Sequence, residues 1–192
     1  MAMNNYLSII TLNINRLNAP TKRHRIAEWI RQHDPHICCL QETHLRTEDL
    51  HKLKVKGSKQ IFQANGQEKK AGVAILISEK IDFQRRAIKR DPEGHLIILK
   101  GRIHQEDINV VKIHTPNIGA PKYMKKMLED FKKDIDSNAI RVGDFNTPLS
   151  KMDRSSKQNI KKDIMALKST LEEMEVTDIW SSSSRRSKIH IL

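Results

Sequence analysis

Polar side chains of one chemical kind follow four separate apolar runs in this sequence. The runs are "TLNIN", "CCLQETH", "VVKIHTPN" and "VGDFN", and they end in Asn13, Asn15, Glu42, His114, Asn117, Asp144 and Asn146. In α/β proteins, side chains at the carboxyl ends of strands converge on a shared rim, so we expect these residues to meet in one cleft. Each ending alone is also typical of a solvated loop or a turn. Four such endings together favour a functional site.

The chemistry that these residue types can perform is coherent. Glu42 is a hard oxygen ligand of the kind that Mg²⁺ or Mn²⁺ prefers. The carboxamides of Asn13 and Asn146 can donate hydrogen bonds to phosphate oxygens without adding negative charge, and Asp144 can orient or deprotonate a water molecule. A metal, a phosphate and a positioned water indicate metal-assisted phosphodiester hydrolysis. The sequence holds no Walker loop, dinucleotide-binding glycine motif or nucleophile elbow, so we expect no small-molecule cofactor.

The charge of the chain indicates a polyanionic partner. Its 35 Lys and Arg residues outnumber 23 Asp and Glu residues, which gives a net charge of +12 and an isoelectric point near 9.8. This excess favours the DNA phosphate backbone as a partner, with Arg16 as a substrate contact beside Asn15 and Asn117. Lys22 and Arg23 are further candidate contacts, although a basic surface can also serve solubility alone.

Cysteine usage and hydropathy bear on the compartment. The adjacent Cys38 and Cys39 lie inside an apolar run and are typical of buried thiols in a reducing environment. The apolar runs are too short to span a bilayer and no secretory signal is visible, so we expect no membrane partner and a nuclear or cytoplasmic location.

The hydrophobic pattern predicts a mixed α/β fold of two sheets flanked by helices. Helical spacing predicts helices over 21–33, 121–136 and 159–175, and a short helical turn in "TEDLHKL". The expected strands are 7–14, "HICCLQE", "QIFQAN", "GVAILIS", "HLIILKGRI", "DINVVKIH" and the run that ends in "GDFN". The polar "HQED" between two of these predicts a β-hairpin.

Six blocks in this order resemble the endonuclease domain of LINE retrotransposon polyproteins, in particular the mammalian LINE-one lineage. They are "TLNIN", "CCLQETH", "QANGQEKKAGVAILIS", "KRDPEGH", "PNIGAP" and "GDFNTPLS…DRS", and the similarity runs from about residue 7 to residue 180. That family belongs to the endonuclease/exonuclease/phosphatase superfamily, with deoxyribonuclease I and the apurinic endonucleases. The resemblance implies a four-layer α/β sandwich and Mg²⁺-dependent nicking of DNA that primes reverse transcription. It also implies the element's RNA as an optional partner through the parent polyprotein.

The resemblance assigns roles to individual positions. Glu42 matches the metal ligand, and Asn13 matches the strand-end residue that supports metal and phosphate. Asn15 falls where apurinic endonucleases carry an acidic residue. Asp144 and Asn146 match the pair that orients the attacking water and holds the scissile phosphate. We expect the glycine before Asp144 to let the strand turn.

Two departures from the family pattern bear on activity. The family has a Tyr where this chain has His114, and its terminal Ser-Asp-His does not occur in the 192 residues. We therefore expect residues 1–180 to form a domain that lacks its last strands, followed by a divergent Ser/Arg-rich tail over 181–192. The sequence predicts a truncated copy with little or no nuclease activity. The alternatives are a non-catalytic nucleic-acid-binding remnant and an unstable product of a decayed element.

Overall fold

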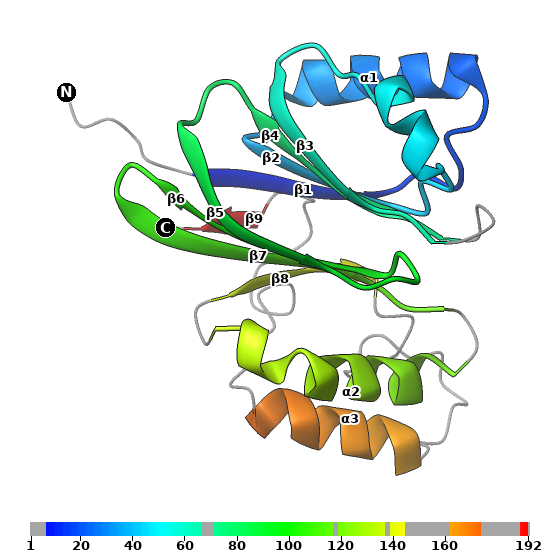
Figure 1. Ribbon diagram of the computed structural model, residues 1–192, viewed down its shortest axis with the longest axis vertical. Helices are drawn as coiled ribbons and strands as arrows, with labels where there is room; N and C mark the ends of the chain where they lie inside the picture. The colour runs from blue at the N-terminus through cyan, green and yellow to red at the C-terminus, as the bar shows by residue number, and fades with distance from the viewer. Residues whose placement is uncertain are drawn as a thin grey trace.

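The protein is built in four layers, as Figure 1 shows: helix α1, a first sheet, a second sheet, and helices α2 and α3. The computed structural model describes residues 7–66, 71–116, 119–136, 139–144, 162–173 and 189–191. The helices are α1 (Pro20–His33), α2 (Ala120–Asp130) and α3 (Lys162–Glu173), with 3-10 turns η1 (Thr47–Lys52) and η3 (Lys132–Asp134). The strands are β1 (Leu7–Asn13), β2 (Ile37–Gln41), β3 (Ser58–Ala64), β4 (Val73–Ser78), β5 (Phe83–Arg90), β6 (Leu96–Ile103), β7 (Glu106–His114), β8 (Ile140–Asp144) and β9 (Ile189–Ile191).

The first sheet has the strand order β3-β4-β2-β1-β9. Its centre is the parallel pair β1 and β2, in which Ile9 is opposite Ile37 and Asn13 is opposite Gln41. Helix α1 makes the crossover that a parallel pair requires. Pro20 begins this helix, where a missing N–H costs nothing, and Asp34 ends it in a left-handed conformation with φ 48°.

The second sheet has the strand order β5-β6-β7-β8. Strands β6 and β7 form the predicted hairpin, with Ile103 opposite Glu106. The two turn residues, His104 and Gln105, both have positive φ (48° and 72°), as a tight hairpin turn that matches the strand twist requires. Strand β8 then pairs in parallel with β7.

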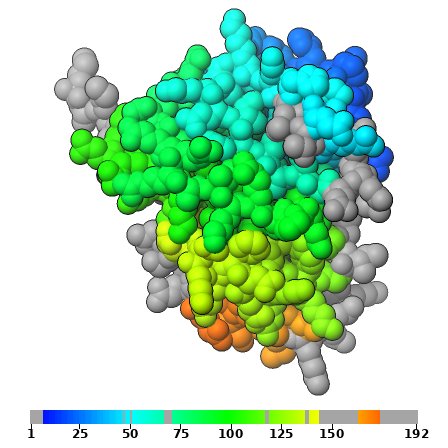
Figure 2. Space-filling view, viewed as in Figure 1, coloured from blue at the N-terminus to red at the C-terminus, as the bar shows by residue number. Residues whose placement is uncertain are grey.

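Three apolar clusters hold the layers together. The central cluster fills the space between the sheets and includes Ile9, Cys39, Ile75 and Val110, all at most 1% exposed. A second cluster packs α1 on the outer face of the first sheet. A third packs α2 and α3 on the outer face of the second sheet. The same order of layers is visible on the surface in Figure 2, with the N-terminal elements at the top and α2 and α3 at the bottom. The predicted four-layer α/β sandwich is confirmed.

Several elements differ from the sequence-based expectation. Strand β5 was not predicted, because half of its residues are charged and most of its side chains are exposed. The helix expected over 121–136 ends at Asp130, and its remainder forms η3. The expected tail contributes β9, which pairs antiparallel with β1. Strand β8 lies in the second sheet and contacts β1 and β2 across the core.

None of the helices in the described part of the chain is long and apolar enough to cross a membrane.

Candidate active site

The carboxyl ends of four strands meet at one end of the two sheets. In the first sheet, the parallel register places Asn13, the last residue of β1, opposite Gln41, the last residue of β2. In the second sheet, it places His114, the last residue of β7, opposite Asp144, the last residue of β8. Each sheet therefore brings one pair of polar strand ends to the same rim. Asn13, His114 and Asp144 were selected from the sequence, and Gln41 was not.

Three of the predicted residues come into contact there. The Asn13 Nδ2 atom donates a hydrogen bond to Glu42 Oε1 at 2.8 Å. The His114 Nε2 atom lies 3.7 Å from the same oxygen, and this contact joins the two sheets. The Glu42 side chain is 23% exposed and that of His114 is 8% exposed. Among the described residues, none makes a hydrogen bond to Glu42 Oε2.

The backbone around Glu42 is unusual. Among the described non-glycine residues, seven have positive φ, and four of these lie in the loops after β1 and β2: Asn15, Arg16, Glu42 and His44. Side-chain alternation would send Glu42 away from the inter-sheet face that Gln41 occupies, but the left-handed backbone at Glu42 (φ 57°) ends the alternation. Such conformations cost free energy and gather at functional sites.

The two loops hold each other through backbone hydrogen bonds. The Arg16 N–H donates to the Glu42 carbonyl at 2.7 Å, and the Leu17 N–H donates to the Thr43 carbonyl at 3.0 Å. The Thr43 N–H in turn donates to the carbonyl of Gly72 at 3.0 Å. Asn13 Oδ1 accepts from the Asn15 N–H at 3.1 Å. The parallel pairing of β1 and β2 thus continues beyond the strands and fixes the loops that carry Glu42 and Asn15.

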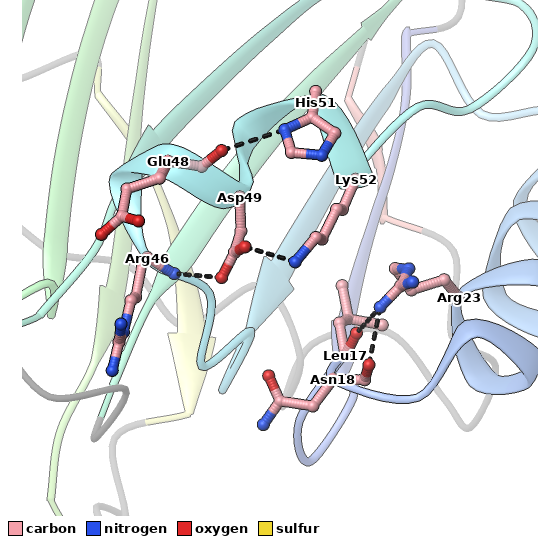
Figure 3. Close-up of polar contacts among 8 residues, drawn as sticks. All are labelled: Leu17, Asn18, Arg23, Arg46, Glu48, Asp49, His51 and Lys52. Carbon is pink, nitrogen blue, oxygen red and sulfur yellow. Dashed lines mark hydrogen bonds and ion pairs between the residues drawn. The ribbon is translucent and has the colours of Figure 1, made fainter.

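Charged side chains stabilise these loops further (Figure 3). The Arg23 guanidinium reaches back from α1 and donates to the carbonyl oxygens of Leu17 and Asn18, at 2.8 Å and 2.7 Å. In the next loop, Asp49 accepts from the Arg46 N–H at 3.3 Å and pairs with Lys52 at 2.5 Å. The sequence predicted Arg23 as a DNA contact, and in this structure one nitrogen of its guanidinium, Nη1, donates to the protein backbone. The side chain of Arg16 is exposed and has no ion pair among the described residues.

A row of rings extends the site beyond His114. The His95 ring stacks on His114 with centroids 5.9 Å apart, and Tyr123 meets His95 edge-on at 5.2 Å. The Tyr123 hydroxyl donates to Glu93 at 3.0 Å, and burial, with this carboxylate as a lesser cause, raises the pKa of Tyr123. Sequence reasoning did not select these residues. The block "KRDPEGH" carried the family resemblance, but nothing in it shows that its histidine reaches β7.

The segment before β6 is shaped by one buried carboxylate. Asp91 is 8% exposed and accepts hydrogen bonds from the N–H groups of Glu93 at 3.1 Å and His95 at 2.7 Å. It also accepts from the Leu96 N–H. Burial raises the pKa of Asp91 despite these donors, which act in the opposite direction. Asp91 therefore fixes the loop that presents His95 to the site.

A lysine lies directly beneath the contacting residues. Lys112 is fully buried on β7, and its Nζ donates to Gln41 Oε1 at 2.5 Å and to Thr11 Oγ1 at 2.8 Å. The sequence offered one signal for it, a single charged residue inside the apolar run "VVKI".

Gly143 has a different role from the one predicted. Strand β8 does not turn there but continues to Asp144. A Cβ atom at Gly143 would lie 1.8 Å from the carbonyl oxygen of Ile113. The glycine is therefore required for the close approach of β8 to β7, and this approach brings Asp144 level with His114.

The structure describes only some of the remaining predicted residues. The backbone of Asp144 is beside His114. Asn117 and Asn146 lie outside the described residues, so their assignments stay predictions.

The donor set suits a hydrated magnesium ion. Mg²⁺ is commonly held by one or two carboxylates together with water and substrate phosphates. Glu42 supplies one partly exposed carboxylate oxygen. Asn13 Nδ2 donates to Glu42 Oε1 and so orients the carboxylate that would bind the metal. Among the described residues, no three His, Cys, Asp or Glu side chains form a metal-binding group.

The four-layer sandwich carries a carboxylate, a carboxamide and an imidazole where the ends of its two sheets meet. The sequence profile of the Endonuclease/Exonuclease/phosphatase family matches residues 10–187. The chain belongs to this family, whose members generally depend on a divalent metal.

Individual proteins are similar to this chain in sequence or in fold. The transposon TX1 uncharacterized 149 kDa protein of Xenopus laevis is 24% identical over 177 residues, which cover 91% of this chain and 14% of that protein. An AP endonuclease from Archaeoglobus fulgidus superposes with a TM-score of 0.61 at 22% identity, over 88% of this chain and 70% of that one. The endonuclease domain of TRAS1, a telomere-specific non-LTR retrotransposon, superposes with a TM-score of 0.59 at 16% identity, over 87% and 70%. The predicted similarity to retrotransposon endonuclease domains is confirmed.

Proposed function

We propose that this chain is a divalent-metal-dependent endonuclease domain that cuts phosphodiester bonds of DNA at the rim formed by β1, β2, β7 and β8. The observation that carries the proposal is the contact of Asn13, Glu42 and His114 around one carboxylate oxygen, in a chain of the endonuclease/exonuclease/phosphatase family. The bound metal would stabilise negative charge that develops on the phosphate.

Each residue has a task in this proposal. Glu42 holds the metal, and Asn13 orients Glu42 by its hydrogen bond. His114 faces the same carboxylate from the second sheet and donates a hydrogen bond to a phosphate oxygen in place of the family's Tyr. Asp144 and Asn146 keep the roles that the sequence assigned, orienting the attacking water and holding the scissile phosphate.

The distribution of basic side chains supports DNA as the substrate. On the flanks of the described structure, many cations are paired with acids, such as Lys100 with Asp136 at 2.8 Å and Arg102 with Asp107 at 3.0 Å. In the loops that follow the strand ends, the side chains of Arg16 and Arg46 are exposed and have no ion pair with the described residues. Cations without a protein partner are the ones that can release counterions from a phosphate backbone, so binding to DNA would weaken steeply with salt.

The level of activity of the 192 residues alone is part of the proposal. They contain no Ser-Asp-His, the segment that supplies a further His and Asp to the site in the family. We infer that the isolated chain nicks DNA slowly, and that binding to DNA without appreciable turnover is the second candidate function.

A plasmid-nicking assay separates these possibilities. Supercoiled plasmid and Mg²⁺ are incubated with this chain, with Glu42→Gln, with the matched control Glu48→Gln, and with a chimera that carries a complete family C-terminus. Glu48 is exposed on η1, so its substitution should change nothing. We expect the chimera to nick fastest, the chain to nick slowly, and Glu42→Gln to abolish nicking in both.

Equal nicking by Glu42→Gln and the unsubstituted proteins would contradict the assignment of the site. Equal rates for the chain and the chimera, both abolished by Glu42→Gln, would show that the chain needs no further residues.

A further inference from the structure

We propose that Lys112 is a positioning residue that sets the geometry of the metal ligand by joining the three strands on which the site is built. The proposal rests on the function proposed above, because it concerns the same site. Lys112 donates to Thr11 on β1 and to Gln41 on β2, while it belongs to β7 in the other sheet. One amino group therefore connects both sheets at the level just below the rim.

The position of each partner makes the connection specific to the site. Thr11 lies two residues before Asn13 on the same strand, so the two side chains share the face of the sheet that is turned toward β7. Gln41 directly precedes Glu42, and Lys112 lies two residues before His114 on the same face of β7. Three residues meet at Glu42 Oε1: Asn13, Glu42 itself and His114. Each of them is one or two positions along the chain from a member of the Lys112 contact, which joins Thr11, Gln41 and Lys112.

The burial of Lys112 makes this connection rigid. Lys112 is among the largest side chains that are completely buried, with 0% exposure. Val110, the preceding inward-facing residue of β7, belongs to the apolar core between the sheets. An amino group inside such a core is costly unless hydrogen-bonded. Its donors therefore hold Gln41 and Thr11 in one arrangement and resist any shift of β7 against β1 and β2.

The alternative is a purely structural role, in which Lys112 stabilises the fold without affecting the site. The two roles differ in what an apolar replacement does. Replacing a buried polar pair by apolar side chains of similar shape can restore stability. It cannot restore a hydrogen bond that sets the position of a strand end. In a suitable double variant, the stability of the fold should therefore recover while the geometry of the metal ligand Glu42 stays disturbed.

The test compares Lys112→Met with the double variant Lys112→Met/Gln41→Met, both in the full chain. Lys100→Met on the adjacent strand β6 is the matched control, since Lys100 is partly exposed and pairs with Asp136 at the surface. Melting temperature is measured for each protein. Binding of Mn²⁺ is measured without DNA by electron paramagnetic resonance. In metal-free protein, nuclear magnetic resonance follows the side-chain amide of Asn13 and the backbone amide of Glu42.

We expect Lys112→Met to lower the melting temperature and the double variant to recover most of the loss. In both, the Mn²⁺ dissociation constant should rise about ten-fold, as for other residues that orient a metal ligand, and the Asn13 and Glu42 resonances should move. Lys100→Met should leave the resonances and the affinity unchanged. Recovery of Mn²⁺ affinity and of the original resonances in the double variant would overturn the proposal and leave Lys112 a structural role.

Failure of the proposed function gives a different result. If the unsubstituted chain binds no Mn²⁺ while the two resonances still move in both Lys112 variants, the metal assignment fails and the positioning role stands. If the resonances do not move in either variant, the positioning role fails whatever the metal result.

Discussion

Replacing Asn13 with Asp should make the stability of this protein depend on a divalent metal. Asn13 Nδ2 now donates to Glu42 Oε1 at 2.8 Å. An Asp at this position cannot donate, and it places a second negative charge beside the first. Two unit charges 4 Å apart repel by about 1 kcal/mol in water and about 4 kcal/mol at an effective dielectric constant of about 20.

Asn13 is exposed and the Glu42 side chain is 23% exposed, so solvent screening places the repulsion near the lower end, at about 1–2 kcal/mol. The lost hydrogen bond adds about 1 kcal/mol. A total of about 2–3 kcal/mol corresponds to a fall in melting temperature of about 4–12 °C for a chain of this size. A divalent cation that binds both carboxylates reverses the effect, by about 2.7 kcal/mol when its concentration is about 100 times its dissociation constant.

The assay is thermal unfolding of the wild type, Asn13→Asp and Asn13→Ala at neutral pH, with and without Mg²⁺. Asn13→Ala loses the hydrogen bond without adding charge, so it should cost only about 1 kcal/mol and gain no extra response to metal. Two adjacent carboxylates share a proton, so the pKa of the pair is raised. The Asp variant should therefore regain stability as the pH falls toward about 5. If Asn13→Asp is as stable as Asn13→Ala without metal, or responds to Mg²⁺ no more than the wild type, the described contact is not the metal site.

Three other results are expected. Gly143→Ala should cost about 3 kcal/mol in chemical denaturation, because its Cβ would meet the Ile113 carbonyl oxygen, and an unchanged midpoint would contradict the β7–β8 register. Burial raises the pKa of both thiols, that of Cys39 to about 11 and that of Cys38 further. A thiol reagent at pH 8 should therefore react only on unfolding, and rapid reaction in the native state would show that the thiols are accessible. Because the thiols of the unfolded chain ionise at lower pH than those of the folded chain, the stability of the fold should fall as the pH rises above about 8.5. Arg23→Gln removes both the two-carbonyl contact and the charge, so it should speed hydrogen exchange in the loop after β1. If Arg23 acts on the loop alone, the salt dependence of DNA binding stays nearly unchanged; a flatter salt dependence would instead make Arg23 a DNA contact.

The strands and their polar ends could be predicted because both are local features of the sequence. A run such as "CCLQETH" shows in one stretch the apolar strand and the carboxylate that follows it. The parallel alignment of Asn13 with Gln41 and of His114 with Asp144 then follows from the general arrangement of α/β folds. These parts of the candidate site needed no knowledge of long-range packing.

The parts that were missed depend on distant partners. A lysine in a strand is usually exposed, and the burial of Lys112 depends on Gln41 and Thr11, which are 71 and 101 residues away. Strand β5 carries charges at half of its positions and belongs to the sheet because β6 pairs with it. The contact of His95 with His114 likewise exists only after β6 and β7 have paired.

The connection made by Lys112 also has a consequence for the order of folding. The bond between Asn13 and Glu42 spans 29 residues, whereas those of Lys112 span 71 and 101, and closing a longer loop costs more chain entropy. During synthesis β1, α1 and β2 leave the ribosome well before β7. We therefore expect strands β1 to β4 of the first sheet to form early, with their apolar inner face open and Gln41 still hydrated, and to wait for β7. An intermediate with such an exposed face is prone to aggregate, so the step that completes the site is also the step that ends this vulnerable period.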